Sequence, residues 1–254
     1  MPYECYYEKQ SQRRLQHLFQ NRTIVFTGDS TMRFLWGQLV NLLDPPPGQQ
    51  FSQVHYGEMR NEQLYVHSND GDYKHSFDQC DRFKISEYRS TKHMIRLVYY
   101  QVLAFGSGRP SPCEQLDVSV FTTWFNSVAH VDVLLINKHY LAKFGCTSDE
   151  QGKSDNALLY RYNHVVESIS RHVVYRSMLA WHDSSLGEHC ASLQLVHGHH
   201  LLKAQLHAQD DQYLDLFTMT HNLTFFEPTD EVHLTYQDNA MLAHILVAVL
   251  ASYL

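Results

Sequence analysis

The triplet Gly28-Asp29-Ser30 stands where an apolar run, residues 23–26, gives way to a helical pattern over 32–43. A serine in such a strand-to-helix turn carries its hydroxyl at the open edge of a sheet. The first N–H groups of the following helix have no partner within that helix, so they can stabilise an oxyanion beside the hydroxyl. The pattern therefore predicts that Ser30 is a nucleophile that attacks an acyl carbonyl.

A serine nucleophile needs a base, and the far end of the chain contains an Asp-x-x-His sequence that joins Asp230 to His233. The imidazole of His233 can take the serine proton, while Asp230 holds the ring in the required tautomer and stabilises its cation. The competing interpretation makes Asp230 the N-cap of a final helix, directly after Pro228 and Thr229. The presence of both motifs in one chain favours a serine hydrolase or acyltransferase.

Four further residues accompany Ser30 in this interpretation. Gly28 gives the backbone freedom that a sharp turn needs, and Asp29 supports the loop as a turn residue or helix cap. Asn137, at the end of an apolar run, can donate its side-chain amide to the oxyanion; the alternative is an ordinary polar strand terminus. Arg33 would lie near the helix start, where it binds substrate, braces the loop or projects into solvent.

Five short runs rich in β-branched and aromatic residues predict buried parallel strands. They cover residues 23–27, 94–104, 131–137, 172–177 and 213–218. Helical patterns cover residues 31–43, 114–129, 154–171, 191–209 and 237–252. This alternation predicts a single α/β domain over residues 1–254, a three-layer α/β/α sandwich around a five-stranded, mainly parallel sheet. The segment 44–93 opens on a proline-rich stretch and has no sustained period, so we expect an irregular insertion there.

The predicted topology brings the candidate residues to one place. In an open parallel sheet, ligands bind beyond the carboxyl ends of the strands. Ser30 follows the first predicted strand, Asn137 ends the third, and the Asp230–His233 motif follows the fifth. All of them are therefore expected at the same edge of the sheet.

Composition narrows the range of partners. The 254 residues carry a formal net charge of −7, which argues against nucleic acid or an anionic membrane as the main partner. Residues 1–20 contain no apolar signal region. The most apolar run, 241–254, is shorter than the ~20 residues that span a bilayer. We therefore expect no signal peptide or transmembrane helix in this chain, and a membrane partner only through an anchor outside it.

The two motifs together resemble a known family. The sequence of residues 24–36, with Gly28-Asp29-Ser30 at its centre, and the Asp-x-x-His at 230–233 are similar to the PC-esterase branch of the GDSL/SGNH hydrolase superfamily. That branch includes the plant trichome-birefringence-like polysaccharide O-acetyltransferases. Two looser stretches, 131–141 and 173–190, resemble the family's strand ending in Asn and its Arg-[Ser/Thr]…His…Cys segment.

The resemblance implies roles for particular residues. Ser30 would be the nucleophile, Asp230 and His233 the relay, and the Ser30 N–H together with Asn137 the oxyanion hole. His139 would support the site, although the family's Asn-x-Gly-His register is one residue shorter here and lacks the glycine. The resemblance also implies the flavodoxin-like strand order 2-1-3-4-5.

The same resemblance implies an activity. An acyl-serine intermediate would pass an acyl group, in this family an acetyl group, to a hydroxyl of a glycan or polysaccharide in the Golgi lumen or elsewhere in the secretory pathway. No resident cofactor or metal is expected, and acetyl-CoA is a candidate acyl donor. Two alternatives remain: a carbohydrate or lipid acetyl esterase that uses the same triad with water, and an inactive binding module on the same fold.

The cysteines and histidines give weaker signals. The five cysteines include no Cys-x-x-Cys, which disfavours a zinc ribbon; they are Cys5, Cys80, Cys113, Cys146 and Cys190. In an oxidising lumen we expect at least one disulfide, with Cys190 as a participant, and in a reducing compartment five free thiols. The histidine-rich stretch 197–200 has no tight ligand pair, so we expect solvated histidines there and no metal.

Overall fold

The computed structural model describes the parts of the chain that form the sheet and the helices on one side of it. These are residues 10–28, 30–44, 72–77, 83–101, 130–137, 170–176, 212–216, 219, 226–227, 230–234 and 236–254. The predicted helices over 114–129 and 191–209 lie outside these residues, as does nearly all of 154–171. The five cysteines and the histidine-rich stretch also lie outside them.

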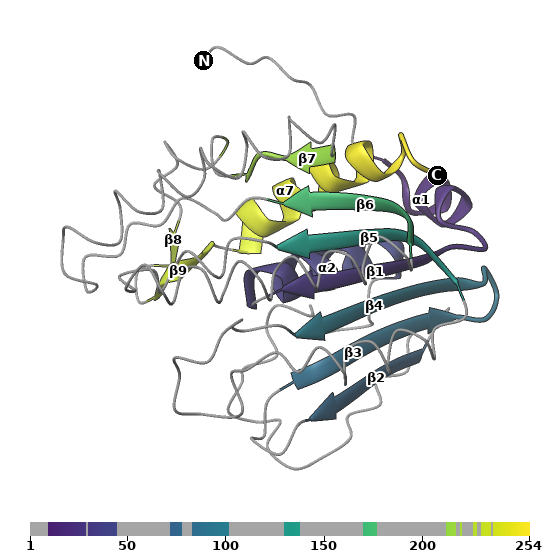
Figure 1. Cartoon of the computed structure of the whole chain (residues 1–254), viewed down its shortest axis with the longest axis horizontal. Helices are drawn as coiled ribbons and strands as arrows, with labels where there is room; N and C mark the ends of the chain where they lie inside the picture. Colours follow the sequence, from purple (N-terminus) through teal and green to yellow (C-terminus); the bar gives the residue numbers. More distant parts are fainter. Residues whose placement is uncertain are drawn as a thin grey trace, which may run out of the picture.

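The fold is built on a seven-stranded sheet with the order β2-β3-β4-β1-β5-β6-β7 (Figure 1). The five strands predicted from the sequence are present as β1 (Thr23–Gly28), β4 (Ile95–Gln101), β5 (Val131–Asn137), β6 (Ser170–Arg176) and β7 (Gln212–Leu214). Each runs parallel to its neighbour among these five. Numbered as predicted, their order is 2-1-3-4-5, so the mainly parallel α/β fold is confirmed.

The segment 44–93 is more regular than the sequence predicts. Within it, β2 (Asp72–Phe77) and β3 (Phe83–Ser90) pair antiparallel and extend the sheet beyond β4. Burial alternates with period two over residues 85–90 of β3, where exposure is described, but two of the three buried positions in this range are the serines Ser86 and Ser90, and the third is Tyr88. Because polar residues occupy the inward positions, the apolar alternation that signals a strand is missing.

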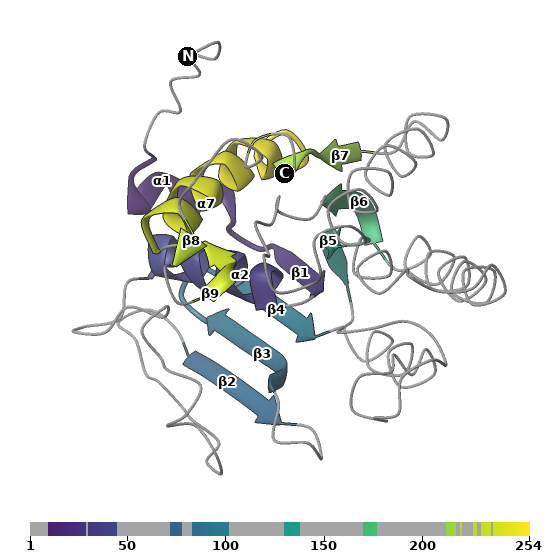
Figure 2. The same cartoon turned by 90° about the vertical axis from the view of Figure 1, so that its left-hand side faces the viewer.

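The described helices lie on one face of the sheet (Figures 1 and 2). They are α1 (Gln12–Leu18), α2 (Ser30–Leu43) and α7 (Tyr236–Leu250), of which α2 and α7 agree with prediction to within two residues. Helix α1 was not predicted, because it is short and only Leu15 within it is buried. None of the helices in the described part of the chain is long and apolar enough to cross a membrane.

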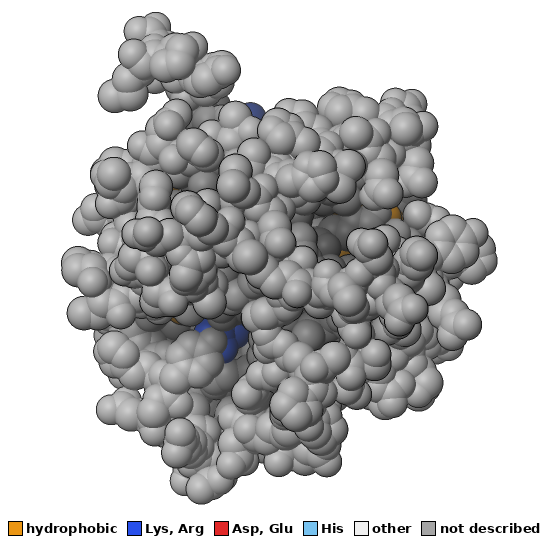
Figure 3. Space-filling view, turned by 60° about the vertical axis from the view of Figure 1, so that its left-hand side comes forward, with side chains coloured by type: hydrophobic (Ala, Val, Ile, Leu, Met, Phe, Trp, Pro, Cys, Tyr) orange, Lys and Arg blue, Asp and Glu red, His pale blue; other side chains and the backbone are white. Residues whose placement is uncertain are grey.

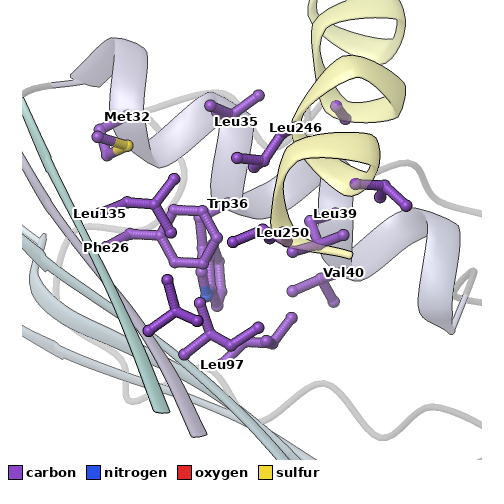
Figure 4. Close-up of a cluster of buried hydrophobic side chains, with 14 of the residues drawn as sticks. Phe26, Met32, Leu35, Trp36, Leu39, Val40, Leu97, Leu135, Leu246 and Leu250 are labelled. Carbon is purple, nitrogen blue, oxygen red and sulfur yellow. The ribbon is translucent and has the colours of Figure 1, made fainter. Parts of the chain in front are cut away.

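The core follows from the alternation of side chains along the strands. Long unbroken runs of β1 and β5 are buried, so both faces of these central strands are covered. On one face, Phe26, Leu97 and Leu135 belong to the same buried cluster as side chains of α2 and α7. Trp36 of α2 lies at the centre of this cluster, next to Phe26 and Leu250 (Figure 4). Helix α2 is therefore held between the sheet and α7, which fixes the position of its first residue, Ser30.

Candidate active site

The carboxyl ends of the parallel strands form one row of residues across the sheet. Gly28 of β1 is in register with Gln101 of β4, and Asn137 of β5 is in register with Arg176 of β6. The register between β1 and β5 pairs the residues one step earlier, at positions 27 and 136, so Gly28 and Asn137 are neighbours in the row. The backbone thus brings two of the predicted site residues, Gly28 and Asn137, onto adjacent strands.

Ser30 occupies the position that the sequence predicts for it. It is the first residue of α2, two residues beyond the end of β1. Gly28 has a φ of 157°, a value that a side chain would disfavour, which explains the glycine before the turn. The hydroxyl of the buried Tyr99 donates a 3.1 Å hydrogen bond to the Gly28 carbonyl. The turn that leads to Ser30 is therefore fixed from the sheet side.

Arg33 lies in the first turn of α2 and is half-buried. Its guanidinium carbon is 5.3 Å from the centroid of the Phe34 ring, a cation–π distance. The three alternatives for Arg33, substrate binding, bracing of the loop and projection into solvent, remain predictions. Two other predicted supporting residues, Asp29 and His139, lie outside the described residues.

Asp230 and His233 lie in β9 (Asp230–Leu234), which pairs antiparallel with β8 (Phe226–Glu227). The alternative in which Asp230 caps the final helix is wrong, because Asp230 begins this strand and α7 begins at Tyr236. Pairing joins Glu227 to Asp230 and Phe226 to Leu234, with a register shift between them. Residues 231–233 are therefore inserted between the two pairs, as in a bulge, and His233 is one of them.

The β8–β9 hairpin lies off the carboxyl ends of the parallel strands, on the side where α2 begins (Figures 1 and 2). The backbones of Ser30, Asn137 and the Asp230–His233 motif therefore lie at the same edge of the molecule. Figure 3 looks toward this side; among the described side chains visible there, Lys or Arg atoms show in a recess in the lower half and again near the top, and hydrophobic atoms show in a recess on the right.

Arg176 is the residue at this edge to which the sequence assigned no role. It is the last residue of β6 and is 1% exposed. Its Nη2 donates a 2.8 Å hydrogen bond to Oγ1 of Thr31, the residue directly after Ser30. The signal in the sequence was an arginine directly after the apolar residues 173–175, within the stretch that resembles the family's Arg-[Ser/Thr] segment.

Comparison with known proteins bears on the fold. No family model and no curated protein matches the chain. Among solved structures, the native aryl esterase of M. smegmatis is similar, with a TM-score of 0.50 and 12% sequence identity over 92% of this chain and 100% of that chain.

Two further structures are similar at lower TM-scores. A carbohydrate acetylesterase from Sinorhizobium meliloti has a TM-score of 0.45 and 12% identity over 92% of this chain and 100% of that chain. A peptidoglycan O-acetylesterase has a TM-score of 0.45 and 10% identity over 95% of each chain. At such identities the aryl esterase match is evidence on the fold alone: the chain has the same mainly parallel α/β fold as that esterase.

Proposed function

We propose that the protein is a serine-dependent O-acyltransferase that moves an acyl group, an acetyl group in the first instance, onto a glycan hydroxyl. The observation that carries the proposal is the position of Ser30, the first residue of α2 at the carboxyl end of the central strand β1. A nucleophile there is next to the first N–H groups of a helix, which make no hydrogen bond within the helix itself. The hairpin that contains Asp230 and His233 lies on the same side of the sheet.

The proposed reaction has two halves. His233 accepts the proton of the Ser30 hydroxyl as its oxygen attacks the acyl carbonyl, and the Ser30 N–H and the Asn137 amide bind the oxyanion. Collapse of the tetrahedral intermediate expels the donor's leaving group, which takes the proton from His233, and leaves acyl-Ser30. The acceptor hydroxyl then gives its proton to His233 as its oxygen attacks the acyl group. The second tetrahedral intermediate expels the Ser30 oxygen, which takes that proton from His233, so both residues return to their starting state. Asp230 holds the imidazole of His233 throughout.

The glycan acceptor rests on the sequence motifs. The Gly-Asp-Ser block and the Asp-x-x-His block support membership of the PC-esterase branch, and through it a polysaccharide acceptor, acetyl-CoA as a candidate donor and a place in the secretory pathway. Hydrolysis is the second candidate, with water as the acceptor in place of a sugar hydroxyl. The observation that favours it is that an aryl esterase has the same fold.

Trapping of the acyl-enzyme tests the proposal. The protein is mixed with p-nitrophenyl acetate and quenched in acid within the first turnover, and the peptide that contains Ser30 is examined by mass spectrometry for one added acetyl group. Acetyl on Ser30 of the wild type and none in Ser30→Ala is the expected result. Release of nitrophenol without acetyl on Ser30 would remove the proposal.

The fraction of the acyl group that goes to a sugar hydroxyl rather than to water then distinguishes the acyltransferase from the esterase. Oligosaccharide acceptors such as xylan fragments are added at rising concentration, and acetate and acetylated sugar are both quantified. Transfer predicts acetylated sugar at the expense of acetate. Acetate that is unaffected by any acceptor would assign the protein to the esterases.

A further inference from the structure

The guanidinium of Arg176 reaches the first turn of α2 from a strand that is not adjacent to β1. Arg176 ends β6, and β5 lies between β6 and β1 in the sheet. Two strand spacings are about 10 Å, so only a long side chain on β6 can reach the helix start. Val174, two residues earlier on the same face of β6, belongs to the buried cluster with α2, and Arg176 continues that face.

The contacts of this side chain are specific. Its Nη2 donates a 2.8 Å hydrogen bond to Thr31 Oγ1, and its Nη1 lies 3.9 Å from Met32 Sδ. Both partners are buried, Thr31 at 4% and Met32 at 0% exposure. Figure 4 shows Met32 at the start of α2, close to the strands of the sheet. The guanidinium therefore lies beneath the helix start, between it and the sheet.

A buried guanidinium has a large desolvation cost, so its hydrogen bonds must be retained for the fold to keep it. At 1% exposure, Arg176 is also closed off from any substrate in this structure. The route to Ser30 that its contacts show is through the residues that it holds, Thr31 and Met32.

The chain around Ser30 is held on both sides. Before it, the Gly28 carbonyl accepts a hydrogen bond from Tyr99 of β4. After it, the Thr31 hydroxyl accepts one from Arg176 of β6. The two anchors come from strands on opposite sides of β1, and they are three residues apart along the chain. Between them the backbone has little freedom to shift.

We propose that Arg176 is a positioning residue that acts through Thr31. By fixing the Thr31 side chain, it fixes the first turn of α2 and with it the backbone of Ser30 and the N–H groups that would face an oxyanion. The effect on catalysis rests on the proposed function of Ser30, whereas the effect on the helix start does not. A nucleophile displaced by about 1 Å loses up to about 100-fold in rate.

Four variants test the hydrogen bond itself: Thr31→Val, Thr31→Ser, Arg176→Met and the double variant Arg176→Met/Thr31→Val. Thr31→Val keeps the shape of the side chain and removes the acceptor, whereas Thr31→Ser retains the hydroxyl. We expect Thr31→Val to lower kcat for p-nitrophenyl acetate about 10- to 100-fold, with KM within about twofold, and Thr31→Ser to remain near wild type. The double variant should be no slower than Arg176→Met alone, because both changes remove the same interaction.

The matched control is Tyr88→Phe at the other end of α2. The Tyr88 hydroxyl donates a 3.1 Å hydrogen bond to the Asp44 carboxylate, and both residues are 1% exposed. This variant also removes one buried hydrogen bond that holds α2 to the sheet, but at the end far from Ser30. It should lower the melting temperature to a similar extent as Thr31→Val and leave kcat unchanged.

A second readout does not depend on turnover. Amide hydrogen exchange is measured on peptides from the first and the last turns of α2. Thr31→Val and Arg176→Met should raise exchange at the first turns only, and Tyr88→Phe at the last turns only. If Arg176→Met does not fold, Thr31→Val alone carries the test.

Each outcome decides the question. Wild-type exchange and wild-type kcat in Thr31→Val would overturn the proposal. Exchange in Thr31→Val that rises equally along the whole of α2, with kcat falling only in proportion to the fraction of unfolded protein, would show that Arg176 stabilises the fold in general. That result would also overturn the proposal. If the wild type neither turns over esters nor becomes acylated at Ser30, the proposed function fails. Selective loosening of the first turns would then still establish the positioning contact.

Discussion

The two ends of the parallel sheet each carry an arginine, and the two side chains are used differently. At the amino ends of the strands, Arg22 donates through Nη1 to Asp132 at 3.1 Å and through Nη2 to the Leu254 carbonyl at 2.9 Å. The other oxygen of Asp132 accepts the N–H of Thr23 at 2.8 Å. At the carboxyl ends, Arg176 donates to the hydroxyl of a residue next to Ser30.

The contacts of the two arginines indicate that the amino ends of the strands serve the stability of the fold, whereas the carboxyl ends serve the proposed chemistry. At the amino end, an arginine and a carboxylate neutralise each other and tie β1, β5 and the last residue together. In the described part of the chain, these two side chains form hydrogen bonds with each other and with backbone groups of the protein. At the carboxyl end, the last residues of three strands form a row, Gly28, Asn137 and Arg176, and helix α2 begins two residues after Gly28. Substitutions at the two ends should therefore change different measured quantities.

The largest effect is expected for Ser30→Ala. Loss of the nucleophile should lower kcat for p-nitrophenyl acetate by several orders of magnitude, because triad members act as a unit. The melting temperature should stay near that of the wild type. The control is Ser252→Ala, an exposed serine that follows α7, which should keep full activity. Full activity in Ser30→Ala would contradict the placement of the active site at the carboxyl ends of the parallel strands.

Almost as large an effect is expected for His233→Ala. Removal of the general base should lower kcat nearly as far as Ser30→Ala, and Asp230→Asn should lower it somewhat less. Acylation rates measured by rapid quench should fall in the same order. A variant of His233 with wild-type rates would move the base elsewhere and leave the β8–β9 hairpin without a catalytic role.

Asn137→Ala should have an intermediate effect. Loss of one oxyanion donor lowers kcat by about 10²–10³-fold with little change in KM. Asn137→Asp is the matched variant: it has nearly the same size, lacks the amide donor and should be at least as slow. A kcat within twofold of wild type in Asn137→Ala would mean that Asn137 is an ordinary strand terminus, and the oxyanion would then depend on backbone N–H groups alone.

Much of this architecture could be predicted from the sequence, because the strands near the centre are buried on both faces. Continuous apolar runs such as residues 133–136 are a clear signal of such strands, and the order of the strands followed from the family resemblance. The strand β3 was missed because Ser86 and Ser90 occupy its inward positions. Local pattern also could not distinguish a helix cap from a strand at Asp230, since an Asp after Pro-Thr is compatible with both.

In the candidate site too, the sequence predicted what local patterns encode but did not predict individual contacts between distant residues. Ser30 could be assigned to a helix start because strand and helix patterns meet there. The role of Arg176 could not be inferred, because it depends on a contact between residues 145 positions apart in the sequence. Such a contact is set by the order of the strands in the sheet and leaves no local pattern.

The smallest effect on activity is expected at the amino end. Asp132→Ala leaves the N–H of Thr23 and the guanidinium of Arg22 without this partner, which should lower the free energy of unfolding by about 1–3 kcal/mol. Because the site is at the opposite edge, kcat at 25 °C should not change. Urea denaturation and steady-state kinetics on the same samples measure both quantities.

The neighbour His130 provides the control for that prediction. Its Nε2 lies 3.3 Å from the same Asp132 oxygen, but its side chain is 66% exposed. An ion pair so exposed contributes at most about 1 kcal/mol, so His130→Ala should shift the urea midpoint much less than Asp132→Ala. A fall in kcat for Asp132→Ala, under conditions where the protein is fully folded, would contradict the division between the two ends. It would mean that the pairing of β1 with β5 at the amino end helps to set the position of Gly28 and Ser30 at the other.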